Sequence, residues 1–160
     1  MAQPSFVPPE SMPRRSLGGG SFVAKFLEAQ NAVYPQVLGE LRAGRKRTHW
    51  MWFIFPQIAG LGRTAISRHF AIEDLDEAQA YLAHPILGRR LHECTRAVLL
   101  HAPDGVAPRS LRDLFGTPDD LKFHSSMTLF HRADPDDPLF NRALRQFFGG
   151  REDQATLNLL

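Results

Sequence analysis

The feature of this sequence that most restricts its fold is the recurrence of apolar residues at intervals of three and four. Leu87, Leu91, Cys94 and Val98 follow this spacing, and the apolar residues of 140–148 repeat it. Such a period places the apolar side chains on one face of an α-helix. No regular strand alternation, clear hairpin signal or solenoid repeat accompanies it. The chain is therefore predicted to be mainly α.

Capping signals divide this pattern into separate helices. Asp74, with Glu77 three residues later, resembles a capping box. Thr117 can cap a helix in which Pro118 takes the first position. Gly44 is a plausible stop for an earlier helix. These signals predict a compact single domain of six to eight short helices.

The composition supports one folded core and sets the N-terminus apart from it. With 43% hydrophobic and 22% charged residues, a chain of 160 residues can bury most of its apolar surface in one domain. Residues 1–20 contain four prolines and end in three glycines. We expect a flexible Pro/Gly-rich tail there and a helical domain over residues 21–160.

Charge, cysteine content and hydropathy limit the partners and the compartment. The formal net charge of +2 is too small to indicate a nucleic-acid partner by itself. Cys94 is the only cysteine, so no internal disulfide can form, which favours a cytoplasmic location. The longest apolar run, Trp50 to Phe55, is far shorter than the roughly 20 residues of a membrane span. No membrane partner is expected.

The segment RKRTHWMWFIFPQIAGLGR, from Arg45 to Arg63, is the strongest candidate for a binding site. It joins three cations, His49, both tryptophans of the chain and a glycine-containing turn. Cations hold phosphates, aromatic faces stack on rings, and backbone N–H groups near glycine can approach an anion. The alternative is that the apolar run is simply core. Residues 48–55 also permit a short strand or an extended segment.

The predicted ligand contacts combine this segment with a polar stretch further along the chain. They are Lys46, His49, Trp50, Trp52, Gln57, Arg63, Lys122, Ser125 and Ser126. The catalytic residue stays unassigned, with Glu28 and His49 as candidates because either side chain can act as a general base. No two histidines have a recognised zinc spacing, so neither a metal nor another cofactor is expected.

Three longer blocks, HWMWFIFPQIAGLGR, DEAQAYLAHPILGRRL and PDDLKFHSSMTLF, resemble an uncharacterised bacterial family, domain of unknown function 1810. The resemblance covers residues 21–160 and implies a mainly α-helical domain. It implies no established reaction and transfers no catalytic residue. The calpastatin-like label that some members carry does not fit, because such inhibitors are largely disordered and this chain has a patterned core.

The function that the sequence favours is binding of a nucleotide-like or phosphorylated small molecule, with hydrolysis of that ligand as one version. Two alternatives stay open. One is a module for single-stranded nucleic acid, against which the small net charge argues. The other is a protein-interaction module that uses an exposed WMWF patch. The sequence decides neither whether the protein is an enzyme nor what protein partner it has.

Overall fold

The computed structural model describes residues 20–160, and these residues form ten helices. The helices are α1 (Gly20–Asn31), α2 (Tyr34–Ala43), α3 (Met51–Ile54), α4 (Ala65–His69), α5 (Leu75–Ala83), α6 (Leu87–Leu99), α7 (Leu111–Phe115), α8 (Asp119–Ala133), α9 (Pro138–Phe148) and α10 (Gln154–Leu157). The mainly α prediction is confirmed. The helices outnumber the six to eight expected because one-turn helices such as α3 and α10 are too short to show an apolar period.

The N-terminal tail predicted for residues 1–20 lies outside the described residues, except for Gly20, which begins α1. Within residues 20–160, β-pairing is limited to one isolated parallel bridge between Ile58 and Ile72. No helix in this described part is long and apolar enough to cross a membrane. The same residues contain no group of three or more His, Cys, Asp or Glu side chains placed to hold a metal ion.

The short strand or extended segment considered for residues 48–55 is not formed at its centre. Residues 51–54 make the single helical turn α3, in which the backbone N–H of Phe55 donates to the carbonyl of Met51 at 3.1 Å. The turn is surrounded by the core on nearly every side, since the side chains of Met51, Phe53 and Ile54 are all buried. Burial from several directions, rather than strand pairing, explains the unbroken apolar run.

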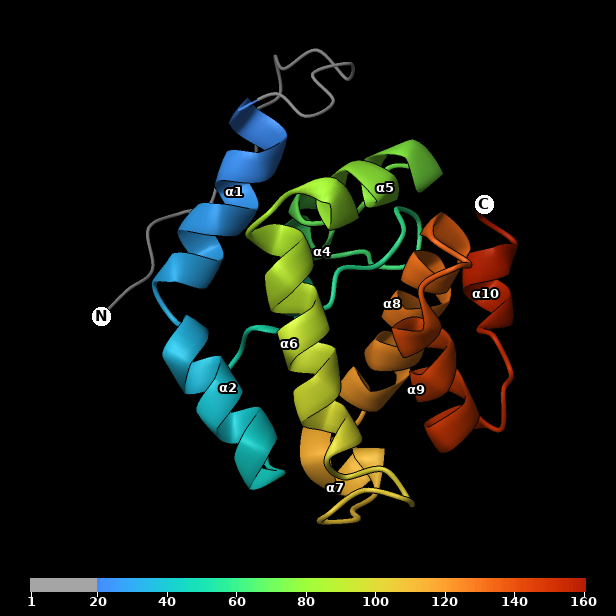
Figure 1. Ribbon diagram of the computed structural model, residues 1–160. Helices are drawn as coiled ribbons and strands as arrows, with labels where there is room; N and C mark the ends of the chain where they lie inside the picture. The colour runs from blue at the N-terminus through green and yellow to red at the C-terminus, as the bar shows by residue number, and fades with distance from the viewer. Residues whose placement is uncertain (1–19) are drawn as a thin grey trace.

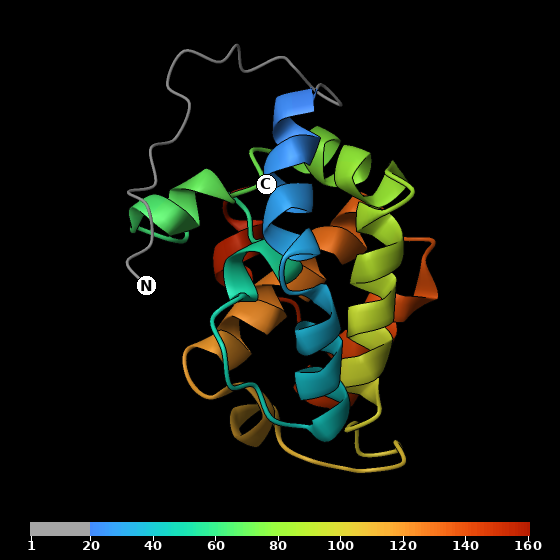
Figure 2. The ribbon, with the colours of Figure 1, turned by 90° about the vertical axis from the view of Figure 1, so that its left-hand side faces the viewer.

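The helices surround a shared core in which α6 and α8 are central. α1 and α2 follow one another down one side, α6 runs beside them, and α8, α9 and α10 lie on the other side (Figures 1 and 2). α5 crosses one end of this assembly and α7 closes the other (Figure 1). α8 packs against α5, α7, α9 and α10, and α6 packs against α2, α5 and α9.

Aromatic rings connect these helices through the middle of the molecule. Phe26 of α1 contacts Tyr81 of α5 at 5.1 Å between ring centres, and Tyr81 contacts Phe130 of α8 at 5.4 Å. Phe55, just after α3, meets Phe123 of α8 edge to face at 5.1 Å. This packing holds the segment that contains α3 against the N-terminal half of α8.

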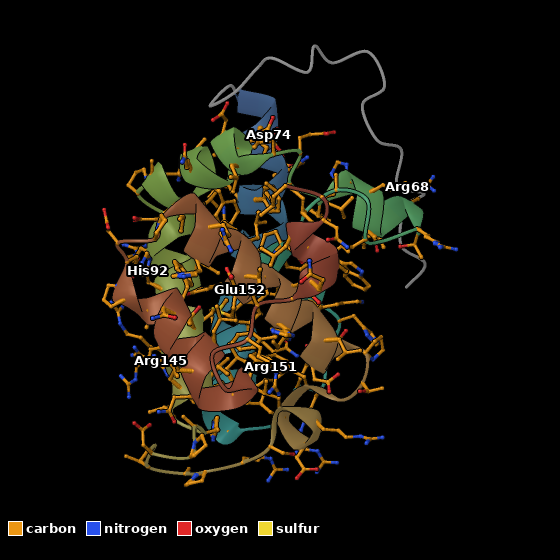
Figure 3. All side chains as sticks on the ribbon, turned by 90° about the vertical axis from the view of Figure 1, so that its right-hand side faces the viewer. Arg68, Asp74, His92, Arg145, Arg151 and Glu152 are labelled. Carbon is orange, nitrogen blue, oxygen red and sulfur yellow. The ribbon has the colours of Figure 1, made fainter. Side chains whose placement is uncertain are left out.

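The local signals at helix ends act largely as the sequence indicates. The Asp74 carboxylate accepts the N–H of Glu77 at 2.9 Å at the start of α5 (Figure 3), and Glu77 in turn accepts the N–H of Glu73 at 3.1 Å. Gly44 ends α2 in the left-handed conformation at φ 77°. Thr117 acts differently, because α8 begins at Asp119 and the Thr117 hydroxyl donates to Asp120 at 2.7 Å.

Candidate functional site

A buried carboxylate organises the loop that carries the predicted basic residues. Glu40 of α2 is 8% exposed and accepts the backbone N–H groups of Arg47 at 2.7 Å and Thr48 at 3.1 Å. It also accepts the Thr48 hydroxyl at 2.7 Å and Trp50 Nε1 at 2.9 Å. Burial by itself would raise the pKa of Glu40, but these donors lower it to about 2. Glu40, which the sequence did not single out, therefore fixes the shape of residues 45–50.

Trp50 belongs to the core. Its side chain is 1% exposed, and its ring lies 6.4 Å from Phe55 and 6.5 Å from Phe115 between centres. The indole N–H donates a hydrogen bond to the Glu40 carboxylate. The predicted role of Trp50 as a ligand contact is therefore not supported by its position. Trp52 is only partly buried and remains the tryptophan that can present a ring surface.

Two of the predicted cations meet on one carboxylate that the prediction had left out. Lys46 Nζ lies 3.0 Å from Asp119 Oδ2, and Lys122 Nζ lies 3.4 Å from Asp119 Oδ1. Each ammonium also lies over a tryptophan ring, Lys46 at 5.1 Å from Trp50 and Lys122 at 5.4 Å from Trp52. We call Lys46, Trp52, Asp119 and Lys122 the lysine–tryptophan cluster.

The flanking cations are exposed. Arg45, Arg47 and His49 all lie on the surface of the loop around Lys46, whose own side chain is only 7% exposed. Arg63 is exposed as well, but it follows the glycine turn, and within residues 20–160 no hydrogen bond or ion pair joins it to the cluster. The structure thus brings Lys46, Lys122 and Trp52 together, with His49 as an exposed neighbour in sequence.

The glycine turn lies next to Trp52 but leaves little space. Trp52, Gln57 and Gly62 line a cavity of only about 10 Å³, enough for about one water molecule. At Gly62 an added Cβ would lie 2.4 Å from the Cβ of Ser67, so this turn requires glycine for close packing. The start of α4 is capped by the Thr64 hydroxyl, which accepts the N–H of Ser67 at 3.2 Å. This geometry explains the glycine without any anion.

The two predicted serines have structural positions. The Ser125 hydroxyl donates to Asp153 at 2.9 Å, and that carboxylate also accepts the N–H and the hydroxyl of Thr156. Ser125 therefore attaches the C-terminal helix α10 to α8. Ser126 is fully buried, and its hydroxyl has no hydrogen-bond partner among the described residues. Glu28 is an exposed residue of α1, and no contact ties it to the cluster.

Fold and site together define a small all-helical domain in which two lysines share one carboxylate beside a half-buried tryptophan. The chain belongs to the family described as protein of unknown function (DUF1810), which matches residues 21–160. It is similar to the crystal structure of the conserved hypothetical protein Rv1873 from Mycobacterium tuberculosis, with 50% sequence identity and a TM-score of 0.82. The similarity covers 88% of this chain and 96% of that chain. No curated protein matches the sequence.

Proposed function

We propose that the domain binds a small anionic molecule that carries both a phosphate and a ring, such as a nucleotide, at the lysine–tryptophan cluster. The observation that carries this proposal is the convergence of two lysine ammonium groups on the single carboxylate of Asp119. Two positive charges and one negative charge leave the cluster with one formal positive charge in excess. The exposed Arg45 and Arg47 add to the positive potential near it.

The two lysines differ in how firmly they are held. Lys46 is almost fully buried, and its ammonium lies 3.0 Å from Asp119, whereas the Lys122 side chain is 25% exposed and lies 3.4 Å away. The Lys122–Asp119 pair joins residues one turn apart on a helix, and ion pairs at this spacing stabilise an isolated helix by only about 0.2–0.5 kcal/mol. Lys122 can therefore leave Asp119 for a phosphate group at small cost, while Lys46 keeps the carboxylate neutralised.

Movement of Lys122 would also free a ring surface. Its ammonium now lies over the ring of Trp52 at 5.4 Å from the centre. When Lys122 turns to a phosphate, the face of Trp52 becomes open to the ring of the same ligand. Stacking of a base on an aromatic side chain is worth about 1–3 kcal/mol. Because the cavity beside Trp52 holds only about 10 Å³, the ligand would lie on the surface rather than in a deep pocket.

The alternatives carry less support. The protein-interaction hypothesis relied on an exposed WMWF patch, but Trp50, Met51 and Phe53 are all buried. A site for single-stranded nucleic acid would use the same cations and Trp52, and its binding would weaken steeply with salt. The cluster supports binding, and we assign no bond-breaking step to Glu28 or His49.

The test is a titration of the purified domain with ATP, NAD, ADP-ribose and ribose 5-phosphate, followed by tryptophan fluorescence and thermal unfolding. At least one ligand should quench fluorescence and raise the melting temperature. Lys122→Gln should weaken its binding at least tenfold, which is about 1.4 kcal/mol. Trp52→Phe should remove most of the fluorescence response. Arg145→Gln is the matched control, because Arg145 is an exposed cation on α9 (Figure 3).

Asp119→Asn separates a binding site from a purely structural ion pair. Removing the carboxylate that competes for the lysines should tighten phosphate binding while lowering the stability of the domain, since Lys46 is left buried without a partner. A wild-type protein that responds to no ligand of the panel refutes the proposal. Equal affinity in the Lys122→Gln variant would do the same for this location.

A further inference from the structure

A second, larger cavity lies at the end of the molecule that α7 closes. It has a volume of about 630 Å³, which is within the roughly 300–1,000 Å³ typical of small-molecule sites. Its walls come from the loop after α6, the start of α7, the first turn of α8 and the last turn of α9, which meet at the lower end of Figure 1. It is separate from the lysine–tryptophan cluster, because Asp120 and Leu121 line it whereas Asp119 and Lys122 belong to the cluster.

The walls are largely apolar and open to solvent. Leu121 lines the cavity and is 60% exposed, which is unusual for a large aliphatic side chain on a helix. Phe147 and Phe148, from the end of α9, are only partly buried, and Pro103 and Pro108 are exposed. An apolar ring system placed here would remove these surfaces from water.

The carboxylate in the wall has hydrogen-bond partners within the protein, whereas the guanidinium does not. Asp120 Oδ1 accepts the Thr117 hydroxyl at 2.7 Å and the backbone N–H of Leu121 at 2.9 Å. In contrast, the guanidinium of Arg109 has neither a hydrogen-bond acceptor nor an ion-pair partner within residues 20–160. The side-chain oxygen of Gln146 accepts the N–H of Asp104 at 3.4 Å, which leaves its amide N–H groups for another acceptor. The cavity therefore offers the N–H donors of Arg109 and Gln146 to a ligand, while the Asp120 carboxylate is already occupied by donors of the protein.

The wall that carries Arg109 is held in a defined position. The two ring nitrogens of the buried His101 lie 2.9 Å from the carbonyl oxygen of Ala107 and 2.7 Å from that of Leu41. The backbone N–H of Arg109 donates to the carbonyl of His101 at 2.9 Å. The Cδ of Arg109 lies 3.1 Å from the place that a Cβ on Gly44 would occupy. Preorganisation of this kind reduces the entropy lost on binding.

We infer that this cavity binds a small apolar, ring-bearing molecule with a single carboxylate or sulfonate group. The anionic group takes the Arg109 guanidinium and the Gln146 amide, and the ring system lies against Leu121 and Phe148. The site is distinct from the proposed phosphate site, because the two share no side chain. An anion with a purely polar body would leave the apolar wall exposed and is not the expected ligand.

The probe for this site is 8-anilinonaphthalene-1-sulfonate, an aromatic sulfonate whose fluorescence rises in apolar surroundings. The native protein should bind one molecule saturably, and indole-3-acetate should displace it. Arg109→Gln and Leu121→Glu should each weaken binding at least tenfold. Their matched controls are Arg68→Gln, at the opposite end of the molecule from α7 (Figure 3), and Val106→Glu, whose side chain is 85% exposed and does not line the cavity. Both controls should bind within about twofold of the wild type, since they alter charge without touching the wall.

Three results would overturn the inference. The first is the absence of saturable binding to the folded wild type, and the second is unchanged affinity in Leu121→Glu. That variant changes an exposed side chain, so it stays informative even if Arg109→Gln is unstable. The third is loss of dye binding in Lys122→Gln with Leu121→Glu unaffected, which would place the dye on the lysine–tryptophan cluster. Conversely, dye binding that survives Lys122→Gln and fails in Leu121→Glu supports this cavity whether or not the phosphate proposal holds.

Discussion

Replacing Glu40 with Gln should lower the free energy of unfolding by about 3 kcal/mol at pH 7. The hydrogen bonds to Glu40 lower its pKa from 4.5 to about 2, and each pKa unit corresponds to about 1.4 kcal/mol. Gln has nearly the same shape, and its oxygen can still accept the three N–H groups that Glu40 Oε1 accepts. Its amide nitrogen takes the place of Oε2, so the Thr48 hydroxyl and the Gln36 amide lose that acceptor, which adds a smaller part of the loss. The loss should therefore report the charge of the carboxylate rather than a cavity.

The pH dependence of this loss gives the sharper test. Because the folded-state pKa is below the unfolded one, the charge of Glu40 stabilises the fold fully above about pH 4.5, and this contribution disappears as the pH falls towards 2. Urea unfolding of the wild type and Glu40→Gln at pH 7, 4.5 and 3 should show two curves that converge in acid. Glu28→Gln, which changes an exposed carboxylate of α1, is the control and should change stability by less than about 0.5 kcal/mol.

Two results would refute the reasoning. A loss below about 1 kcal/mol at pH 7 would show that solvent screens the carboxylate despite its burial. A loss of constant size from pH 7 to pH 3 would show that packing, and not charge, is responsible. Either result would also remove the basis for regarding residues 45–50 as a loop held by Glu40.

Three further predictions concern other parts of the fold. Gly44→Ala should destabilise by about 1–3 kcal/mol in urea unfolding, because φ is 77° and the new Cβ would lie 3.0 Å from His101; an unchanged midpoint would contradict this. Asp137→Asn should keep the helix cap, because an Asn oxygen can still accept the N–H of Leu139, and should remove the carboxylate that faces His92. Burial opposes the charge of Asp137, but hydrogen bonding to His92 lowers its pKa, so the loss should be present above about pH 4 and fade in stronger acid. Burial raises the pKa of Cys94 to about 12, so Ellman's reagent should label it only after unfolding, and rapid labelling of the native protein would show that the thiol is accessible.

The fold could be predicted well where local chemistry decides it. The cap at Asp74 and the stop at Gly44 depend on residues within one turn, and both occur as the sequence indicates. The short helix α3 could not be assigned, because four residues are too few to show a period and buried apolar runs look alike in strands and helices. That choice is made by tertiary packing, in which α3 contacts α1 and α6.

For the candidate site, the sequence indicated which types of residue take part but not which side chains contact one another. The sequence indicated Lys46 and Lys122, but Asp119, which joins them, was not among the predicted contacts. Nor could it tell Trp50 from Trp52, since burial depends on residues far away in the chain. Ser125 looked available because its partner, Asp153, lies 28 residues further on. The large cavity escaped notice because its walls come from four separate segments.

The first turn of α8 faces two surfaces at once. Asp119 and Lys122 point to the lysine–tryptophan cluster, while Asp120 and Leu121 line the cavity beside Arg109. A ligand that shifts this turn from one side changes the geometry offered to the other, and such coupling must be equal in both directions. Affinities measured at one surface are therefore comparable between variants only when the occupancy of the other is held constant, and a thermodynamic cycle across Lys122 and Leu121 would measure the coupling.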